Sequence, residues 1–213
     1  MRKLSDTQKN FNLEAAQAYQ EALPGSPAEE FLGKRGLLKP RVKEFGLGYV
    51  ADERPGLERF VGMLCIPYYR PTYDGSDLVV TMRFRCLEDH EHMYHGKYNS
   101  LEADRPRMFN TKALVETSPS IAICEGELDA ITAEVCGVPA VGIPGAQLWK
   151  PAFRDVFLGY ETVWILADGD EAGRHLAATI KKELPNSKHI PMPSGLDVND
   201  VYLRDGDIKE SLS

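Results

Sequence analysis

Acidic residues follow two apolar segments in the C-terminal half of the chain. Glu125 comes directly after segment 120–124, and Asp168 and Asp170 come directly after segment 162–167. An apolar run that ends in a carboxylate and turns through glycine into a helix is typical of a buried strand in an open α/β sheet, where ligands bind at the carboxyl edge. We expect the three side chains to reach a common point. Oxygen ligands of this kind suit Mg²⁺, which keeps several of its waters, so the pattern predicts a metal site that can take a phosphate.

Two further carboxylates are candidates for the same site. Asp129 lies one helical turn beyond Glu125 and is expected to point back toward the same edge. Alternatively, Glu127 and Asp129 are acids that complement the dipole of a first helical turn. Asp197 opens a third acidic segment, 197–200, where it either caps a last helix or supplies a further carboxylate for a two-metal arrangement.

The elements that must position these carboxylates alternate from about residue 119 onward. Strands are expected at 121–125, 140–143, 162–167 and 188–190, and helices at 128–136, 147–157 and 171–184. Alternating elements with short connections predict an α/β fold with a mostly parallel sheet flanked by helices. Gly169 allows a tight turn after the third strand, and Gly173 allows close packing of the helix that follows.

The first half of the chain has a different pattern. Helices are expected at 6–23, 26–36 and 40–45, and β-type segments at 60–69 and 78–87 with a turn at 73–76. Ser26 is expected to cap the second helix, with Glu29 completing a capping box. Residues 88–113 are polar and irregular. An α+β subdomain, residues 1–115, is therefore expected before the α/β subdomain, residues 116–213.

Composition limits the class of protein. The chain has 213 residues, 43% hydrophobic and 27% charged, as an ordinary soluble globular protein does. It contains neither an apolar run of membrane-spanning length nor an apolar segment near the N-terminus that would direct export. Cytoplasmic action is therefore expected, without a membrane partner. The four cysteines form no C-x₂-C pair, so no structural zinc is expected.

Charge is uneven along the chain. The net charge of −7 is unlike the basic face of most nucleic-acid-binding proteins. Basic residues nevertheless recur in segments 34–43 and 83–112, while acids gather in 125–129, 168–171 and 197–207. Because a bound divalent metal would neutralise part of the acidic centre, net charge alone does not exclude a nucleic-acid partner.

The acidic motifs resemble the Toprim signature shared by primases, topoisomerases, recombination mediators and small nucleases. The similarity lies in Glu125-Gly126-x-x-Asp129-Ala130 after one strand and Asp168-Gly169-Asp170-x-Ala172-Gly173 after a later one. Segments of the first half resemble the polymerase domain of bacterial DnaG-type primases in the same order: 31–37, 42–49, 66–69, 79–85 and the lysine motif Lys97-Tyr98-Asn99-Ser100. The resemblance covers roughly residues 27–205.

This resemblance implies the catalytic core of a DNA primase with a Toprim fold, which synthesises RNA primers in DNA replication with Mg²⁺ or Mn²⁺. Glu125 would be the catalytic acid or base and a metal ligand. Asp168 and Asp170 would also hold the metal, Asp129 would support them, and Asp197, with Asn199 or Asp200, would match a third acidic motif. That motif often has two Asp residues spaced by one, whereas Asn199 occupies the second place here, so a weaker metal site is expected.

The resemblance also implies partners, namely a single-stranded DNA template and ribonucleoside triphosphates. Five residues would lie along their path and contact phosphates: Arg83, Arg85, Lys97, Asn99 and Lys112. For each basic residue, a solvated surface role is the alternative. The chain is expected to lack the N-terminal zinc module and the C-terminal helicase-contact domain of the family, because it has no matching cysteine set and few residues after Leu203. It is therefore expected to be a phage-type minimal primase or one piece of a split system, working with a replicative helicase or a separate zinc-bearing protein.

Two other functions remain as alternatives. A Toprim nuclease would use the same acids to hydrolyse a phosphodiester, and a nucleic-acid or replisome binding module would not use them for catalysis. A topoisomerase is disfavoured because the length leaves no room for a domain with a strand-cleaving tyrosine.

Overall fold

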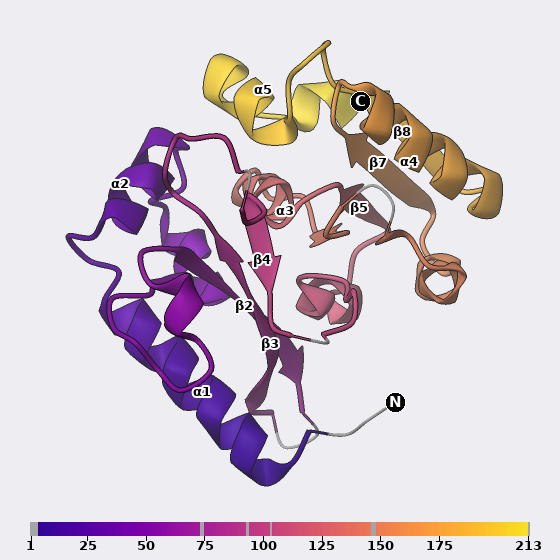
Figure 1. Cartoon of the computed structure of the whole chain (residues 1–213). Coiled ribbons are helices and arrows are strands. Elements are labelled where there is room, and N and C mark those ends of the chain that lie inside the picture. Colours follow the sequence, from indigo (N-terminus) through magenta and orange to yellow (C-terminus); the bar gives the residue numbers. More distant parts are fainter. Residues whose placement is uncertain (1–3, 73–74, 93, 103, 146–147, 213) are drawn as a thin grey trace. The chain divides into compact units, whose positions relative to one another are not determined.

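The structure is a computed structural model that describes residues 4–72, 75–92, 94–102, 104–145 and 148–212 (Figure 1). The chain forms two compact units, Met1–Arg105 (unit 1) and Pro106–Ser213 (unit 2). The sequence placed the boundary between residues 115 and 116. The units divide earlier because Phe109 already pairs with Gly142 of unit 2 through two backbone hydrogen bonds of 2.8 and 3.2 Å.

Unit 1 is an antiparallel sheet with helices. Its strands are β1 (Gly48–Tyr49), β2 (Leu64–Pro71), β3 (Asp77–Arg85) and β4 (Tyr98–Ser100), in the order β1-β2-β3-β4. Its helices are α1 (Asp6–Glu21) and α2 (Pro27–Lys34), with the 3₁₀ helices η1 (Pro40–Phe45) and η2 (Glu58–Phe60). The sequence missed β4, which lies in the segment predicted to be irregular. Of the turn predicted at 73–76, Tyr73 and Asp74 lie outside the described residues.

The helices of unit 1 begin where side chains satisfy free backbone N–H groups. Ser26 accepts a hydrogen bond from the N–H of Glu29 at 3.3 Å, as expected for a cap. The Glu29 carboxylate accepts from the N–H of Gly25 at 2.7 Å, one residue before the position of a regular capping box. The core of this unit includes Phe60 and Phe84, whose rings stack with centroids 3.9 Å apart.

Unit 2 is a four-stranded sheet flanked by helices. Its strands are β5 (Ser120–Cys124), β6 (Ala140–Gly142), β7 (Thr162–Ala167) and β8 (Ser187–Pro191), in the order β6-β5-β7-β8 and all parallel. Its helices are α3 (Glu127–Val135), α4 (Glu171–Glu183) and α5 (Val198–Asp205), with the 3₁₀ helices η3 (Thr111–Val115), η5 (Pro151–Phe157) and η6 (Lys209–Leu212). The predicted α/β class with a parallel sheet is confirmed.

One predicted helix of unit 2 is shorter and of another type. The sequence predicted a helix over 147–157, whereas the structure has the 3₁₀ helix η5 from Pro151. Proline lacks the N–H that an α-helix interior needs, and it suits the first position of a new helix. Gln147 itself lies outside the described residues.

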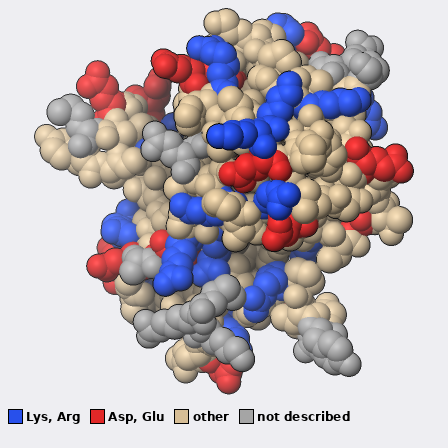
Figure 2. Space-filling view, turned by 90° about the vertical axis from the view of Figure 1, so that its right-hand side faces the viewer, with Lys and Arg blue, Asp and Glu red and all other residues tan. Residues whose placement is uncertain are grey.

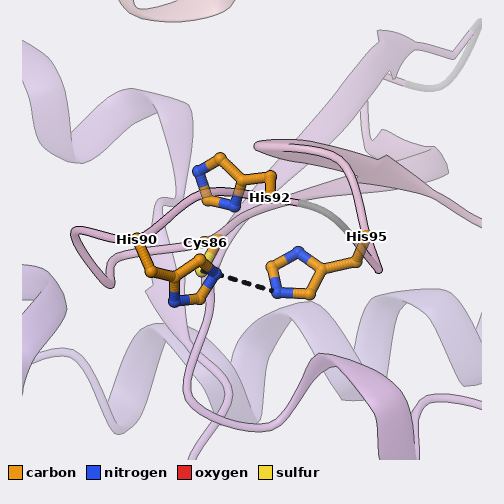
Figure 3. Close-up of side chains that lie close together, drawn as sticks. All are labelled: Cys86, His90, His92 and His95. Atoms are coloured by element: carbon orange, nitrogen blue, oxygen red, sulfur yellow. Dashed lines mark hydrogen bonds between the residues drawn. The ribbon is translucent and has the colours of Figure 1, made fainter.

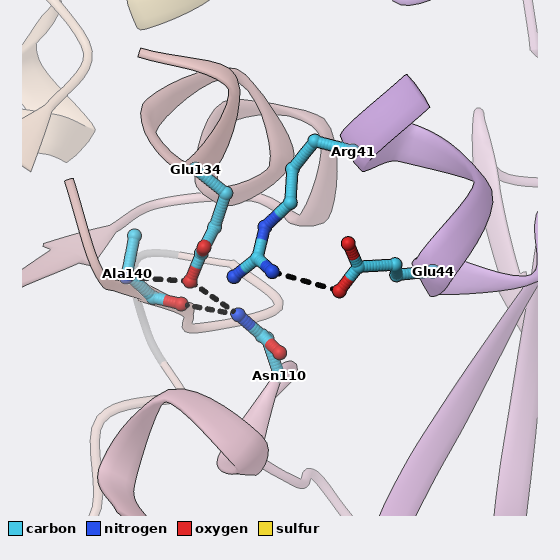
Figure 4. A network of polar contacts seen from close by, with 5 residues as sticks. All are labelled: Arg41, Glu44, Asn110, Glu134 and Ala140. Carbon is cyan, nitrogen blue, oxygen red and sulfur yellow. Dashed lines mark hydrogen bonds and ion pairs between the residues drawn. The ribbon is translucent and has the colours of Figure 1, made fainter. Parts of the chain in front are cut away.

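A buried polar network fixes the end of α3 against β6 (Figure 4). Glu134 is only 4% exposed, and its Oε1 accepts hydrogen bonds from the side chain of Asn110 at 2.8 Å and from the N–H of Ala140 at 3.1 Å. Asn110 also donates to the carbonyl of Ala140 at 2.8 Å. Asn110 adopts a left-handed conformation, φ 55°, which asparagine tolerates better than most residues.

Among the described ranges, there is no helix with the length and apolar character needed to cross a membrane.

Candidate active site

Glu125 and Asp168 lie together at the carboxyl edge of the parallel sheet. Strands β5 and β7 pair in parallel with Cys124 opposite Leu166, so the two strands end at the same level of the sheet. The backbone N–H of Asp168 donates a hydrogen bond to Oε2 of Glu125 at 3.3 Å. The structure thus brings together the two acids that the sequence placed at neighbouring strand ends.

The turn after β7 is held against the segment that leads to α5. The N–H of Gly169 donates to the carbonyl of Leu196 at 2.9 Å, and the N–H of Gly195 donates to the carbonyl of Gly169 at 3.1 Å. A Cβ atom on Gly169 would overlap the carbonyl oxygen of Pro193, and one on Gly173 would overlap the backbone of Asp168. Glycine is therefore required at both positions by close backbone approach.

The other three candidate acids have well-defined places around this edge. Asp170 caps α4 by accepting from the N–H of Gly173 at 2.8 Å. Asp129 is 9% exposed in the first turn of α3, and its Oδ2 lies 2.8 Å from where a Cβ on Gly126 would be, so it points back toward the strand end.

Asp197 has the capping role that the sequence analysis kept as an alternative. Its Oδ1 accepts from the N–H of Asp200 at 2.7 Å, while the Asp200 carboxylate accepts from the N–H of Asp197 at 3.1 Å. This reciprocal box occupies one oxygen of each carboxylate.

Asn199 has a structural role. It is completely buried, and its Nδ2 donates to Oγ1 of Thr132 at 3.0 Å, which in turn donates to the carbonyl of Leu128 at 2.8 Å. This chain of hydrogen bonds joins α5 to α3. The position at which the resembling family often has a second aspartate therefore holds two helices together.

The acids at this edge raise one another's affinity for protons. The pKa of the Asp168 carboxyl is raised from 3.8 to about 7. Burial is the largest cause, followed by the negative charges of Glu125, Asp197, Asp170 and Asp200. Burial also raises the pKa of Glu125, with smaller contributions from Asp170 and Asp129. The described groups at this edge therefore do not fully compensate the negative charge of these carboxylates.

These residues fit a divalent cation. Oδ1 of Asp168 is shielded from solvent and has no hydrogen-bond partner among the described residues. A buried polar atom without a partner is costly, and a cation would satisfy it while relieving the repulsion between the carboxylates. The donors are all carboxylate oxygens, which suit Mg²⁺ or Mn²⁺.

Four of the five nucleic-acid candidates belong to unit 1, near the hairpin of β3 and β4. Arg85 is 6% exposed; its guanidinium lies 4.6 Å from the ring centroid of Phe31 and 5.2 Å from that of Tyr98, and it donates to the Tyr98 hydroxyl at 3.1 Å. Arg83 is half-buried beside the same tyrosine, 5.2 Å from its ring centroid. Arg85 is therefore a packed residue of unit 1, with little surface for a ligand.

The remaining candidates differ in exposure. Lys97 is exposed, whereas the side chain of Asn99 is half-buried and donates to the carbonyl of Gly96 at 2.7 Å. Lys112 is half-buried in η3 of unit 2. On the face shown in Figure 2, Lys and Arg side chains are interspersed with Asp and Glu side chains.

Sequence reasoning missed one group of metal-ligating residue types, Cys86, His90, His92 and His95, whose ligand atoms lie within 4.8 Å of one another. A search confined to C-x₂-C pairs cannot find it. The signal was available, because one cysteine and three histidines fall within a single short segment.

Comparisons with known proteins match both units. Residues 122–202 match the family model described as Toprim-like. The chain is 50% identical over 145 residues to the gene 57 protein of Mycobacterium phage D29, an alignment that covers 68% of this chain and 93% of that protein.

The fold has counterparts among solved structures. The RNA polymerase domain of Mycobacterium tuberculosis primase DnaG superposes with a TM-score of 0.74 at 23% identity, covering 96% of this chain and 82% of that one. A DnaG primase catalytic domain bound to single-stranded DNA gives 0.74 at 19% identity, covering 96% and 79%. The likeness covers nearly the whole chain, so the predicted fold is confirmed for both halves.

Proposed function

Because the chain belongs to the family of the phage D29 gene 57 protein, and carries a Toprim-like domain within the fold of a DnaG-type primase catalytic core, we propose that it is a DNA primase catalytic core. It synthesises short RNA primers from ribonucleoside triphosphates on a single-stranded DNA template. The observation that carries the proposal is the pairing of Glu125 with Asp168 at the aligned ends of β5 and β7.

The carboxylates at the carboxyl edge of the parallel sheet, Glu125, Asp168, Asp170 and Asp197 (the acidic edge), supply the chemistry. Glu125, Asp168 and Asp170 hold Mg²⁺ or Mn²⁺, with Asp197 as a further carboxylate. When bound, the metal stabilises the charge that develops as a primer 3′-hydroxyl displaces pyrophosphate from the α-phosphate of a nucleotide. Glu125 accepts the hydroxyl proton. Asp129 supports this edge from the first turn of α3.

Unit 1 supplies contacts to the polyanionic partners. Lys97, Arg83 and Asn99 lie at or beside the β3–β4 hairpin, and Lys112 lies in unit 2. Such side chains contact phosphates without reading base sequence, so template binding is weak and sensitive to salt. We place the activity in the cytoplasm, that of the host if the chain is phage-encoded, with a replicative helicase or a separate zinc-bearing protein as partner.

Primer synthesis on single-stranded DNA with radiolabelled ribonucleotides and Mg²⁺ or Mn²⁺ tests the proposal. Wild-type protein should make short RNA, and Asp168→Asn and Glu125→Gln should make at least about 100-fold less, as expected when a group that stabilises the transition state is lost. Asp155→Asn changes an exposed aspartate of η5 and serves as the matched control. Circular dichroism of each variant confirms that the fold persists.

Two results would contradict the proposal. RNA synthesis by Asp168→Asn at the wild-type level would show that the acidic edge does not take part in the reaction. Metal-dependent degradation of DNA or RNA without synthesis, abolished by the same substitution, would instead identify a Toprim nuclease.

A further inference from the structure

A second group of ligand-type side chains lies in unit 1, in the chain between β3 and β4. Cys86 comes directly after β3, and His90, His92 and His95 belong to the loop that follows (Figure 3). Each residue offers one ligand atom, and these four atoms all lie within 4.8 Å of one another. The proposed polymerase chemistry uses none of them.

The spacing of these atoms matches a tetrahedral metal site. Nε2 of His90 lies 3.2 Å from Nε2 of His95 and 3.9 Å from Sγ of Cys86. With metal–nitrogen bonds of about 2.0 Å and a metal–sulfur bond of about 2.3 Å, two ligand atoms of a tetrahedral zinc site lie roughly 3.3–3.7 Å apart. Small side-chain movements would therefore be enough for coordination.

Two of the histidines are already oriented by outer contacts. Nδ1 of His90 lies 2.9 Å from a carboxylate oxygen of Glu88, and Nδ1 of His95 lies 3.1 Å from the carbonyl oxygen of Gly96. A histidine that donates its Nδ1–H to such an acceptor keeps the Nε2 lone pair for a metal. Metal-binding histidines almost always have an outer partner of this kind.

The third histidine has a buried atom that the protein does not satisfy. Nδ1 of His92 is shielded from solvent and has no hydrogen-bond partner among the described residues. A buried nitrogen without a partner is costly, and a metal ion bound there would satisfy it.

The backbone holds the loop in place around Cys86. The N–H of Cys86 donates to the carbonyl of Lys97 at 3.0 Å, and Arg85 pairs with Tyr98 in the β3–β4 ladder. The two ends of the loop are thus joined beside the buried thiol, which is 7% exposed. A metal bound here would link the loop to the end of β3.

We propose that Cys86, His90, His92 and His95 bind one structural Zn²⁺ that fixes the loop between β3 and β4. One sulfur and three imidazole nitrogens favour zinc over Mg²⁺, which prefers oxygen. Four protein ligands complete a tetrahedron and leave no open position, so the role is structural. The site replaces the expectation, based on the absence of C-x₂-C pairs, that the chain holds no structural zinc.

Metal content of the full chain, purified without a histidine tag, is the first test. Wild-type protein, dialysed against metal-free buffer, should hold about one zinc per chain. Cys86→Ser and His95→Asn should each hold less than about a tenth as much, because metal affinity depends on the complete ligand set. Cys136→Ser and His175→Asn change the same residue types outside the cluster and should keep the zinc, as should Asp168→Asn, which removes a carboxylate of the acidic edge.

Cobalt spectroscopy on wild-type protein tests the ligands without relying on a variant that folds poorly. Chelator-treated protein refilled with Co²⁺ should show the intense visible bands of tetrahedral coordination and a thiolate-to-metal charge-transfer band in the near ultraviolet. That charge-transfer band should be missing in Cys86→Ser and present in Cys136→Ser.

Three outcomes would overturn the proposal. Wild-type protein that holds less than about a tenth of an equivalent of zinc, even after incubation with Zn²⁺, has no site of this kind. Equal zinc content in Cys86→Ser and wild type would place the metal elsewhere. Cobalt bands of octahedral intensity without thiolate charge transfer would exclude the four-ligand set. None of these readouts depends on polymerase activity, so the zinc site and the proposed function can fail independently.

Discussion

The backbone N–H of Asp168 lies 3.3 Å from Oε2 of Glu125, although 43 residues separate them in the chain. The parallel pairing of β5 with β7 makes this contact possible, because both strands end at the same level. It brings two acids together at an edge where Asp170 and Asp197 add further negative charge. The expected dependence of stability on pH and Mg²⁺ follows from this crowding of carboxylates.

Stability of the metal-free protein should fall as pH rises through neutrality. The pKa of Asp168 is about 7 in the folded protein and 3.8 ordinarily, so its protonated form is favoured by folding. This contribution is fully present below about pH 4 and is lost as pH rises through about 7. Relative to Asp168→Asn, wild type should lose about 1–2 kcal/mol between pH 4 and 8, after allowing for solvent screening at this partly exposed edge.

Urea unfolding at several pH values, in a chelator and in millimolar Mg²⁺, measures that difference. Mg²⁺ should reduce the loss in wild type because the cation compensates the ionised carboxylates. Parallel pH profiles for wild type and Asp168→Asn would contradict the proposed electrostatic cause.

Gly169→Ala should destabilise unit 2 strongly. The added Cβ would overlap the carbonyl oxygen of Pro193, which is backbone and cannot rotate away. We expect a loss of about 1–3 kcal/mol in the free energy of unfolding, together with loss of primer synthesis, because the same turn carries Asp168. Gly159→Ala is the matched control, since its Cβ would meet no atom within 4 Å. Equal stabilities of the two variants would show that the turn can shift.

Asn199→Asp should weaken the protein rather than improve metal binding. The residue is fully buried, and its Nδ2 donates to Thr132 Oγ1. An aspartate there would lose the donor and bury a charge, at a cost of about 2–4 kcal/mol near neutral pH. Chemical denaturation gives the cost, and a Mg²⁺ titration of synthesis gives the metal dependence. Higher Mg²⁺ affinity at unchanged stability would contradict the assigned role.

Arg85→Met should cost about 2–3 kcal/mol of stability in unit 1, because the buried guanidinium lies over the rings of Phe31 and Tyr98 and donates to the Tyr98 hydroxyl. Arg70→Met, at an exposed position of β2, should change stability by less than about 0.5 kcal/mol. Thermal unfolding distinguishes the two variants. If Arg85→Met were as stable as Arg70→Met and lost only DNA affinity, Arg85 would be a ligand-binding residue.

Lys97→Ala should leave stability nearly unchanged and weaken binding to single-stranded DNA. A lysine that contacts one phosphate contributes about 0.7 to the slope of log affinity against log salt. Fluorescence anisotropy with a labelled oligonucleotide, measured at several salt concentrations, should show that the slope falls by this amount. Lys182→Ala removes an exposed lysine of α4 and should leave the slope unchanged.

Local sequence signals predicted most elements because their causes are local. Ser26 and Pro27 begin α2, and Asp197 caps α5 with side-chain hydrogen bonds that span three residues. The strands β5 and β7 are continuous apolar runs, as strands buried on both faces are. By contrast, β4 is three residues long and polar, so only its pairing with β3 defines it.

The amino-acid sequence by itself determined which acids stand at strand ends, because an apolar run followed by Glu125 or by Asp168 is a property of neighbouring residues. Only the tertiary structure decided what those acids and their neighbours contact. Asn199 joins two helices and the Arg85 guanidinium lies over the ring of Phe31, and both contacts connect residues far apart in the chain. The grouping of Cys86 with His90, His92 and His95 likewise needed the path of one loop, because their spacing alone does not show that four ligand atoms meet.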